Sequence, residues 1–474
     1  MCRALHVFSP LAVFVLLVTP AVAWADAPLR AAFAAVDITP DVKGKKPVFL
    51  AGYGHGRVAK GVHDRLMARG LVIESGGEKI ALVAVDLVGL QYPAVQQIRK
   101  KLPHYKYVMV SSTHNHEGPD VIGIWGATPL HNGVDPDYIK LVVERVVKLV
   151  RTAEAALLPA EAFYGTAKDE SLLGDSRLPK VYDGVLRTVR FNRAGSKKRL
   201  GVLVQWNCHP EALGSRNTQV TADFPATTVA ELSKRYQCPI AYFSGAVGGL
   251  MAPPDGLFKN AKGDVLKEGQ FEYAEAYGRA VAKLAEKAID SAKPIRLAPL
   301  RVSAKPIALP LENKLYRAAR VAGVLTREAR LWTGDAEKLG KRATLSDVFR
   351  STAVVTEVAY LQLGELHVAC IPGELYPELV YGKFQDPVDP AADFPKAPLE
   401  PTVMKSLPGE RVLVFGLAND EIGYIIPKRQ WDAKAPYCYG RKKSQYGEIN
   451  SCGSEVAPII MKALADRVRE AGEK

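Results

Sequence analysis

The stretch Tyr105-Lys-Tyr-Val-Met-Val110, continued by Ser111-Ser-Thr-His-Asn-His-Glu-Gly-Pro-Asp120, decides how the rest of the chain can be arranged. Its β-branched and aromatic first half predicts a buried strand, and Gly118-Pro119 predicts that a loop follows. Side chains two residues apart in an extended segment point to one face, so His114 and His116 should project together. Ligands bind at the carboxyl ends of strands in open α/β sheets, so this pair predicts half of a metal site. The alternative is an ordinary pair of hydrogen-bonded histidines.

Strand and helix signals alternate on both sides of that stretch. Strands are expected at residues 32–38, 67–74, 79–88, 105–110, 162–166, 186–192, 201–206, 240–243, 301–309, 353–363, 366–371 and 412–417. Helices are expected at residues 92–102, 138–156, 225–235, 273–292, 312–332, 375–381 and 455–469. The sequence has no repeat and no shift in composition. We therefore predict one large α/β domain, with a mixed or mostly parallel sheet flanked by helices and a zinc site at the strand C-terminal ends.

The N-terminus has the pattern of a secretory signal peptide. Arg3 precedes an apolar run over residues 7–18, and two small-x-small cleavage sites end at Ala23 and Ala25. We expect residues 1–25 to be removed and residues 26–474 to form the mature protein, which would be secreted or periplasmic. No later apolar run approaches the ~18 residues of a membrane helix, so no transmembrane segment is expected in the mature form.

The positive charge of the chain limits which binding partners are expected. The formal net charge is +13, which could attract nucleic acid, anionic lipid surfaces or acidic polymers. The sequence contains no nucleic-acid-binding motif, so we expect no nucleic-acid partner. A solvated surface is the simplest interpretation, and peripheral contact with an anionic membrane surface stays open.

Two cysteines could form a disulfide. Cys438 and Cys452 flank a loop-like segment and are a candidate pair, while the spacing of the cysteines fits no zinc-thiolate pattern.

Several predicted strands end in short turns that carry a polar residue or a cluster of glycines. These turns hold the histidine pair, His209, the glycines around Gly245, and Glu374. His209 alone could be a core histidine, and Glu374 alone could be a carboxylate favoured at a helix N-terminus. Together they predict a zinc site with nitrogen and oxygen ligands and one position open for water.

The motifs, taken in order, resemble the neutral/alkaline, non-lysosomal ceramidases, secreted zinc amidases that cleave the N-acyl bond of ceramide. The match includes Asp37-Ile-Thr-Pro40, Ala51-Gly-Tyr53, Gly61-Val-His-Asp-Arg65, Asp86, Thr113-His-Asn-His-Glu-Gly-Pro119, His209-Pro210, Pro372-Gly-Glu374, Gly416-Leu-Ala-Asn419, Gly423-Tyr-Ile425 and Gln445-Tyr446. Each motif alone is weak, but the ordered set is specific. The resemblance implies that residues 26–474 form a ceramidase-like catalytic domain.

The resemblance also implies roles for individual residues. It implies one Zn2+ ion per chain, with ligands His114, His209, Glu374 and Tyr446. It implies further that His116 faces the substrate and that Arg177 and Tyr424 line the reacting centre. In that scheme zinc lowers the pKa of a bound water and polarises the amide carbonyl, and Tyr424 or Arg177 stabilises the oxyanion. A histidine carries the proton to the leaving amine.

Alternatives exist for three of these residues. Tyr424 could be a core aromatic residue, and Arg177 could be a surface cation. The segment before Tyr446 is longer than in the family, so Tyr437 or Tyr439 could compete for the zinc.

The chain departs from the family pattern at three points. The family's glycine-aspartate-x-serine-proline turn appears as residues 248–253, and the family serine aligns with Met251, which cannot donate a proton. A serine commonly follows the histidine pair, whereas this chain has Glu117, which we predict to be a carboxylate general base. The chain also ends soon after the tyrosine motif, so the family's C-terminal immunoglobulin-like domain is expected to be absent.

These observations predict an exported zinc-dependent amidohydrolase that cleaves the N-acyl bond of ceramide, or of a ceramide-like lipid, by metal-activated water. A hydrolase of the same scaffold acting on a different small amide or ester is an alternative, which Met251 favours. A non-catalytic lipid- or glycan-binding relative is a further alternative. The retention of all four ligand positions argues against it.

Overall fold

The computed structural model describes residues 28–473, so the predicted signal peptide at residues 1–25 lies outside the described residues. Between residues 28 and 473, none of the helices combines the length and the hydropathy that a membrane-spanning segment requires.

A nine-stranded mixed sheet lies at the centre, in the order β11-β9-β8-β6-β1-β3-β4-β5, with β13 beside β6. Its strands are β1 (Arg30–Asp37), β3 (Met67–Ser75), β4 (Glu78–Val85), β5 (Tyr107–Ser112), β6 (Leu158–Lys168), β8 (Val185–Arg193), β9 (Arg199–Trp206), β11 (Ile240–Ser244) and β13 (Lys293–Ile295). Neighbours pair antiparallel, except for the parallel pairs β4–β5 and β9–β11. The expected α/β domain with a mixed sheet is confirmed, and the alternative of a mostly parallel sheet is wrong.

A five-stranded sheet packs face to face against the first, in the order β14-β16-β17-β19, with β15 beside β16. Its strands are β14 (Leu300–Pro310), β15 (Ala329–Leu331), β16 (Thr352–Leu363), β17 (Leu366–Cys370) and β19 (Val412–Phe415). Leu71 and Leu82 of the first sheet share one core with Leu361, Val368 and Phe415 of the second. Short ladders pair β2 (Gly61–Val62) with β10 (Gln219–Val220), β7 (Gly174–Asp175) with β12 (Met251–Ala252), and β18 (Glu374–Leu375) with β20 (Tyr424–Ile425).

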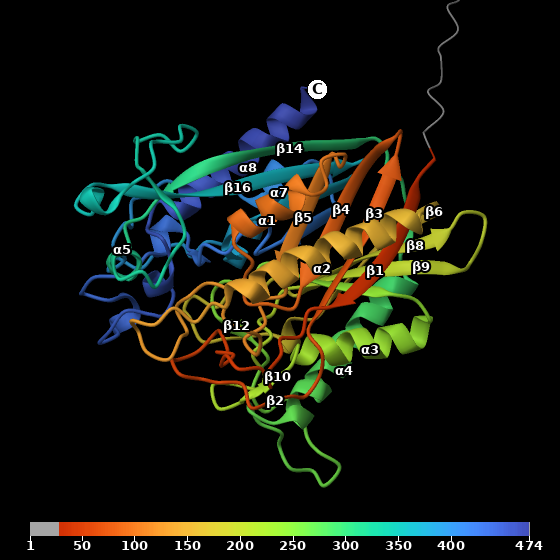
Figure 1. Cartoon of the computed structure of the whole chain (residues 1–474), viewed down its shortest axis with the longest axis horizontal. Helices are drawn as coiled ribbons and strands as arrows, with labels where there is room; N and C mark the ends of the chain where they lie inside the picture. The colour runs from red at the N-terminus through yellow and green to blue at the C-terminus, as the bar shows by residue number, and fades with distance from the viewer. Residues whose placement is uncertain (1–27, 474) are drawn as a thin grey trace, which may run out of the picture.

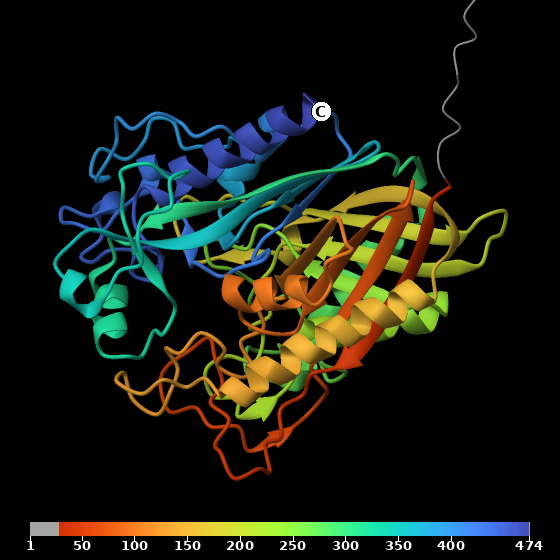
Figure 2. The same ribbon diagram turned by 45° about the horizontal axis from the view of Figure 1, so that its top comes forward.

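Helices cover the outer faces of both sheets, which gives four layers (Figures 1 and 2). They are α1 (Tyr92–Lys100), α2 (Pro136–Ala155), α3 (Phe224–Tyr236), α4 (Phe271–Asp290), α5 (Lys314–Val321), α6 (Pro377–Tyr381), α7 (Val403–Ser406) and α8 (Val456–Gly472). Helix α2 packs on β1 and β3, α4 on β6 and β8, and α8 on β14 and β16. The start of α2 follows from its sequence, because the Asp135 carboxylate accepts the N–H of Asp137 and Pro136 occupies the first turn.

Two expectations from the sequence are wrong. The helix expected at residues 312–332 is limited to α5, because Gly323 adopts a left-handed conformation (φ +74°) just after it and stops the helix. The expected pair Cys438–Cys452 is also wrong, since both thiols are free and buried.

Candidate metal centre

The loops that follow β5, β9 and β11 are joined to one another by hydrogen bonds. The Ser244 hydroxyl, at the end of β11, donates to the carbonyl oxygen of Thr113 (2.7 Å). The N–H of His116, in the loop after β5, donates to the carbonyl oxygen of Pro210, in the loop after β9 (3.2 Å). The parallel pairs β4–β5 and β9–β11 therefore bring their carboxyl ends to one place, where a site can be assembled.

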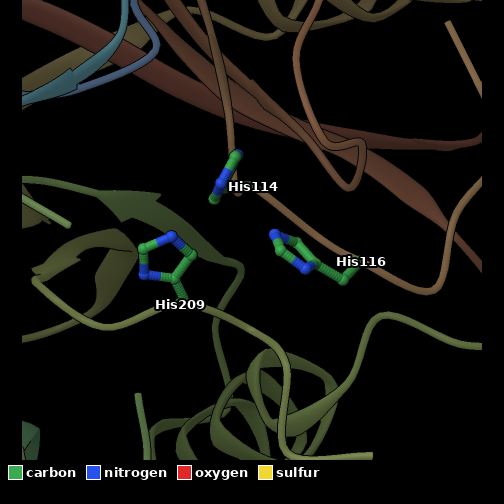
Figure 3. A group of neighbouring side chains, drawn as sticks. All are labelled: His114, His116 and His209. Atoms are coloured by element: carbon green, nitrogen blue, oxygen red, sulfur yellow. The ribbon is translucent and has the colours of Figure 1, made fainter. Parts of the chain in front are cut away.

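Three buried imidazoles meet there. The ligand nitrogens of His114, His116 and His209 lie within 4.8 Å of one another. Figure 3 shows the three rings around a common space, with His114 and His116 from one loop and His209 from another. Such a buried group of histidines could hold a metal ion.

Backbone carbonyls fix two of these rings in the orientation that a metal ligand needs. The Nδ1–H of His114 donates to the carbonyl oxygen of Val88, and that of His209 donates to the carbonyl oxygen of Met251 (both 2.7 Å). A carbonyl can only accept, so Nδ1 carries a proton in both rings, and Nε2 is the nitrogen that faces the Glu374 carboxylate and that a metal would take. The two Nε2 atoms lie 3.4 Å and 3.0 Å from the same carboxylate oxygen of Glu374. Two nitrogens and one oxygen therefore point at one position.

The charges of the cluster distinguish Glu374 from His116. Burial would raise the pKa of Glu374, but the neighbouring His114 and His209 lower it to about 2, so the group is a carboxylate. Burial, followed by the charges of His114, His209 and Arg57, holds the pKa of His116 well below its usual value. Both ring nitrogens of His116 are buried without a hydrogen-bond partner among the described residues. His116 is therefore a neutral imidazole, with the Glu211 carboxylate 3.5 Å from its Nδ1.

A pocket opens beside these side chains, and we call the polar and the apolar residues of its lining the polar wall and the apolar wall. The polar wall includes His114, His116, Glu374 and Tyr424. The apolar wall consists of Ile122, Ile124, Trp125, Leu311, Leu325, Val354 and Ile422. The arrangement suits a substrate that has a polar group next to a hydrocarbon portion.

Known proteins share both the sequence pattern and this fold. Over 288 residues the chain is 25% identical to the neutral ceramidase of Pseudomonas aeruginosa, in an alignment that covers 53% of this chain and 42% of that enzyme. The crystal structure of neutral ceramidase from Pseudomonas aeruginosa superposes over 94% of this chain and 74% of its own, with a TM-score of 0.69 at 17% identity.

A ceramidase solved in complex with C2 superposes with a TM-score of 0.67 at 16% identity, over 94% of this chain and 76% of its own. The chain is similar to the neutral ceramidases in fold and, over part of its length, in sequence. No protein-family model matches it, and the sequence alignment spans less than half the length of the curated ceramidase.

Tyr424 and Tyr446 are both candidates for the fourth zinc ligand that the ceramidase resemblance predicts. Strands β18 and β20 run parallel with Glu374 directly opposite Tyr424, which is buried. Tyr446, for which the ligand role was predicted, lies 5.8 Å from the Tyr424 ring between centroids, is 48% exposed, and accepts a hydrogen bond from Asn450. Tyr439 instead donates its hydroxyl to Gln385. The ligand role of Tyr446 stays a prediction, and the strand pairing makes Tyr424 a second candidate.

Arg177 lies behind the segment that carries Tyr446. Its two Nη atoms bond the two carboxylate oxygens of Glu448 (2.8 and 2.7 Å), and Nη1 also donates to the carbonyl oxygen of Tyr446 (2.7 Å). It is not among the described residues that line the pocket. A role of Arg177 at the reacting centre stays a prediction, whereas its contacts are those of a residue that positions Tyr446.

Glu117 points away from its neighbour His116. Its carboxylate contacts the Arg57 guanidinium (3.1 Å) and accepts a hydrogen bond from Asn217 (2.8 Å). Burial raises its pKa to about 8, against the opposing effect of Arg57. The general-base role proposed for Glu117 stays a prediction, because nothing places this carboxylate in the pocket. The geometry favours His116 for proton transfer.

The contrast between these two neighbours gives a direct prediction. Glu117→Gln should keep kcat within about threefold of the wild type, because glutamine keeps the hydrogen-bonding shape toward Asn217. His116→Gln should lower kcat by at least about a hundredfold, the usual contribution of general acid–base catalysis. Steady-state hydrolysis of an N-acyl substrate, with zinc content measured on the same samples, checks both. If Glu117→Gln lowered kcat by a hundredfold at unchanged zinc content, Glu117 would be the general base.

Gly52 leaves the room in which the His116 ring lies. Its φ is +95°, and a Cβ added there would lie 2.4 Å from Cγ and 2.6 Å from Nδ1 of His116. Only glycine tolerates both the conformation and the contact.

Gly52→Ala should therefore displace the His116 ring and lower kcat/KM by about a hundredfold, the loss expected from a misplacement of about 1 Å. Zinc content should be unchanged, because His114, His209 and Glu374 are not touched. Gly54→Ala, two residues on and with open space around its Cβ, is the matched control. Equal activity of the two variants would contradict the packing role of Gly52.

The sequence pattern did not reveal Glu421, which also lines the pocket. Its Oε1 accepts the N–H of Gly423 (2.6 Å), and its Oε2 is buried with no hydrogen-bond partner among the described residues. Burial and the charge of Glu374 raise its pKa well above the usual value. The only signal in the sequence was an acidic pair, Asp420-Glu421, between two of the ceramidase motifs.

Met251 lies at the position of the family serine, and its side chain cannot supply the hydroxyl group of that serine. Its side chain packs in a hydrophobic core with Trp206 and Tyr277, and its carbonyl oxygen accepts the Nδ1–H of His209. The turn therefore contributes to the site by orienting a ligand through its backbone.

Proposed function

We propose that this chain is an exported zinc-dependent hydrolase that cleaves the N-acyl amide bond of ceramide or of a ceramide-like lipid. The observation that carries the proposal is the convergence of His114, His209 and Glu374 beside a pocket with an apolar wall. The ceramidase relationship supports the choice of an amide substrate. The proposal includes a signal peptide at residues 1–25, a catalytic domain at residues 26–474, and a secreted or periplasmic location.

The donor set fits zinc. Two imidazole Nε2 atoms, each with its Nδ1–H held by a carbonyl, and one ionised carboxylate are typical ligands of a catalytic zinc. A phenolate oxygen from Tyr424 or Tyr446 would complete the set. Zinc, when bound, supplies Lewis acidity, which polarises a carbonyl and lowers the pKa of water.

The remaining pocket residues supply the other requirements of amide hydrolysis. His116, neutral and without a hydrogen-bond partner among the described residues, accepts a proton from the attacking water and returns it to the leaving amine. Whichever of Tyr424 and Tyr446 is not a ligand keeps its hydroxyl proton, because burial raises the pKa of both, and can donate to the oxyanion. The apolar wall takes a hydrocarbon chain and excludes water from the reacting carbonyl.

The two tyrosines can be separated by mutation. Tyr424→Phe is expected to weaken zinc binding by at least about tenfold, because the strand pairing sets Tyr424 opposite Glu374. Tyr446→Phe is expected to leave zinc affinity nearly unchanged and to lower kcat. Competition of each variant with a fluorescent chelator gives the affinities. The reverse order of affinities would assign the ligand position to Tyr446.

A hydrolase of the same scaffold with a different amide or ester substrate is the second candidate. Met251 provides no hydroxyl where the family has a serine, and one oxygen of the Glu421 carboxyl group has no hydrogen-bond partner among the described residues. That carboxyl group would favour a substrate with a second polar group near the scissile bond.

The test is fatty-acid release from ceramide by the mature protein, after removal of metal and again after addition of zinc. Release that returns with zinc is the expected result. A protein that takes up one zinc but releases no fatty acid would overturn ceramide as the substrate. A panel of short N-acyl amides and esters would then identify the second candidate, and inactivity toward all of them would indicate a non-catalytic relative.

A further inference from the structure

The most exposed large apolar side chains gather in four neighbouring segments. Phe349 is 97% exposed, Leu130 77%, Leu315 57%, Val321 53% and Ile449 52%, and these are the five highest values for large apolar residues in the range 28–473. Single exposed apolar residues are normal on a protein surface. A group of exposed apolar residues in adjacent segments is typical of an interaction surface.

Hydrogen bonds join these segments around α5. The Asn132 side chain donates to the carbonyl oxygen of Val324 (2.9 Å), which holds the loop of Leu130 against the end of α5. Asn313, the N-cap of α5, donates to the carbonyl oxygen of Ile449 (2.8 Å). Arg317 of α5 donates to the carbonyl oxygens on both sides of Phe349, Val348 (2.7 Å) and Arg350 (3.0 Å). Figures 1 and 2 agree that α5, the orange segment after β5 and the blue segment before α8 lie at one end of the molecule.

The same segments, apart from that of Phe349, contribute residues to the lining of the pocket. Trp125, Tyr316, Leu325 and Tyr446 line the pocket, and they come from the segments that carry Leu130, Leu315, Val321 and Ile449. We call Leu130, Leu315, Val321, Phe349 and Ile449 the apolar rim. Helix α5 has no buried residue, so it lies on the surface with apolar and basic side chains presented outward.

Positive charge accompanies the apolar rim. Residues 314–350 hold nine lysines and arginines, one of which, Arg327, has its side chain buried in an ion pair with Asp420, against four acids, and residues 434–446 hold four against none. Arg441, Lys442 and Lys443 are exposed, and no ion pair joins them to an acid among the described residues. Apolar tips flanked by cations are the pattern of a surface that lies in the interface of an anionic bilayer.

We propose that the apolar rim and the cations around it dock the protein on an anionic lipid bilayer, with the pocket entrance facing the membrane. A second copy of the chain is a poor occupant, because two such cationic faces would repel each other. An acidic polymer would need the cations but not the apolar tips. Docking in this orientation would let a lipid pass from the bilayer into the pocket, and only this last step rests on the proposed function.

Flotation with vesicles of phosphatidylcholine, alone or mixed with phosphatidylglycerol, tests the proposal without any measurement of activity. The wild type should bind the mixed vesicles at least about tenfold more strongly, and added salt should weaken this binding. Leu315→Ser/Phe349→Ser should bind about tenfold more weakly than the wild type. Lys442→Gln/Lys443→Gln should lose about fivefold for each charge on the mixed vesicles only. Leu158→Ser is the matched control, because Leu158 is 41% exposed on β6, a strand that Figure 1 shows at the opposite end of the molecule from α5.

Equal binding of the wild type to both kinds of vesicle, or equal losses in Leu158→Ser and Leu315→Ser/Phe349→Ser, would overturn the proposal. So would a dimer in solution that Leu315→Ser/Phe349→Ser converts to a monomer. Thermal melting of every variant separates a binding loss from unfolding. If vesicle binding behaves as expected but no ceramide is cleaved, the proposed function fails while the docking surface remains.

Discussion

His209→Ala is expected to remove bound zinc and to lower kcat/KM for an N-acyl substrate by at least about a thousandfold. The Nε2 of His209 lies 3.0 Å from the Glu374 carboxylate, and the opposite ring nitrogen is held by the Met251 carbonyl, so the imidazole is fixed toward the site. Loss of the metal removes several kcal/mol of transition-state stabilisation, and each ~1.4 kcal/mol is a factor of ten. Zinc per chain by mass spectrometry and steady-state kinetics on one preparation give both values.

His104→Ala is the matched control, because His104 is exposed and pairs only with Glu154 on the surface among its described contacts. It should keep both zinc and activity. If His209→Ala keeps one zinc per chain with full activity, the metal does not lie in this cluster.

Arg177→Ala is expected to destabilise the folded protein by about 3–5 kcal/mol, the cost of leaving one partner of a buried ion pair alone. Arg177 is 2% exposed and Glu448 is 7% exposed, and the pair is joined by two hydrogen bonds. The substitution also frees the carbonyl oxygen of Tyr446, so kcat should fall in the fraction that remains folded. Urea unfolding and kinetics at low temperature measure the two effects.

Arg279→Ala tests the same kind of ion pair on the surface. Arg279 pairs with Glu275 at 3.3 Å, one helical turn away, and both side chains are nearly half exposed. Such a pair contributes about 0–1 kcal/mol. Arg177→Met/Glu448→Leu should be more stable than Arg177→Ala, because no charge is left buried. Equal unfolding free energies for Arg177→Ala and Arg279→Ala would contradict the structural role of the buried pair.

Local pattern was sufficient for most of the fold and for part of the site. The strand before the histidine pair and the hairpin at residues 353–371 have strong β-branched patterns, and they appear as β5, β16 and β17. The histidines were visible because they follow a buried strand at a spacing of two. The helix predicted at residues 312–332 was too long, because an isolated glycine does not always stop a helix and its effect depends on the surrounding contacts.

Long-range packing decided the rest of the site. The expected extended segment at the histidine pair is wrong, because β5 ends at Ser112 and His114 has a positive φ (66°), so loop packing and not strand alternation brings His114 and His116 together. The partner of Glu117, Arg57, is 60 residues away in the sequence. Arg177 meets Glu448 across 271 residues, and no local pattern signals such a pair. Glu421 enters the pocket only because the loop between β19 and β20 packs beside Gly89, where a Cβ would lie 2.3 Å from the Glu421 Cβ.

An anomalous-difference map at the zinc absorption edge, from crystals of the zinc-loaded protein, tests the metal centre most directly. The account predicts one peak about 2.0–2.2 Å from the Nε2 atoms of His114 and His209 and from a Glu374 oxygen. Absence of a peak between these three side chains, or a peak held by other residues, would contradict it.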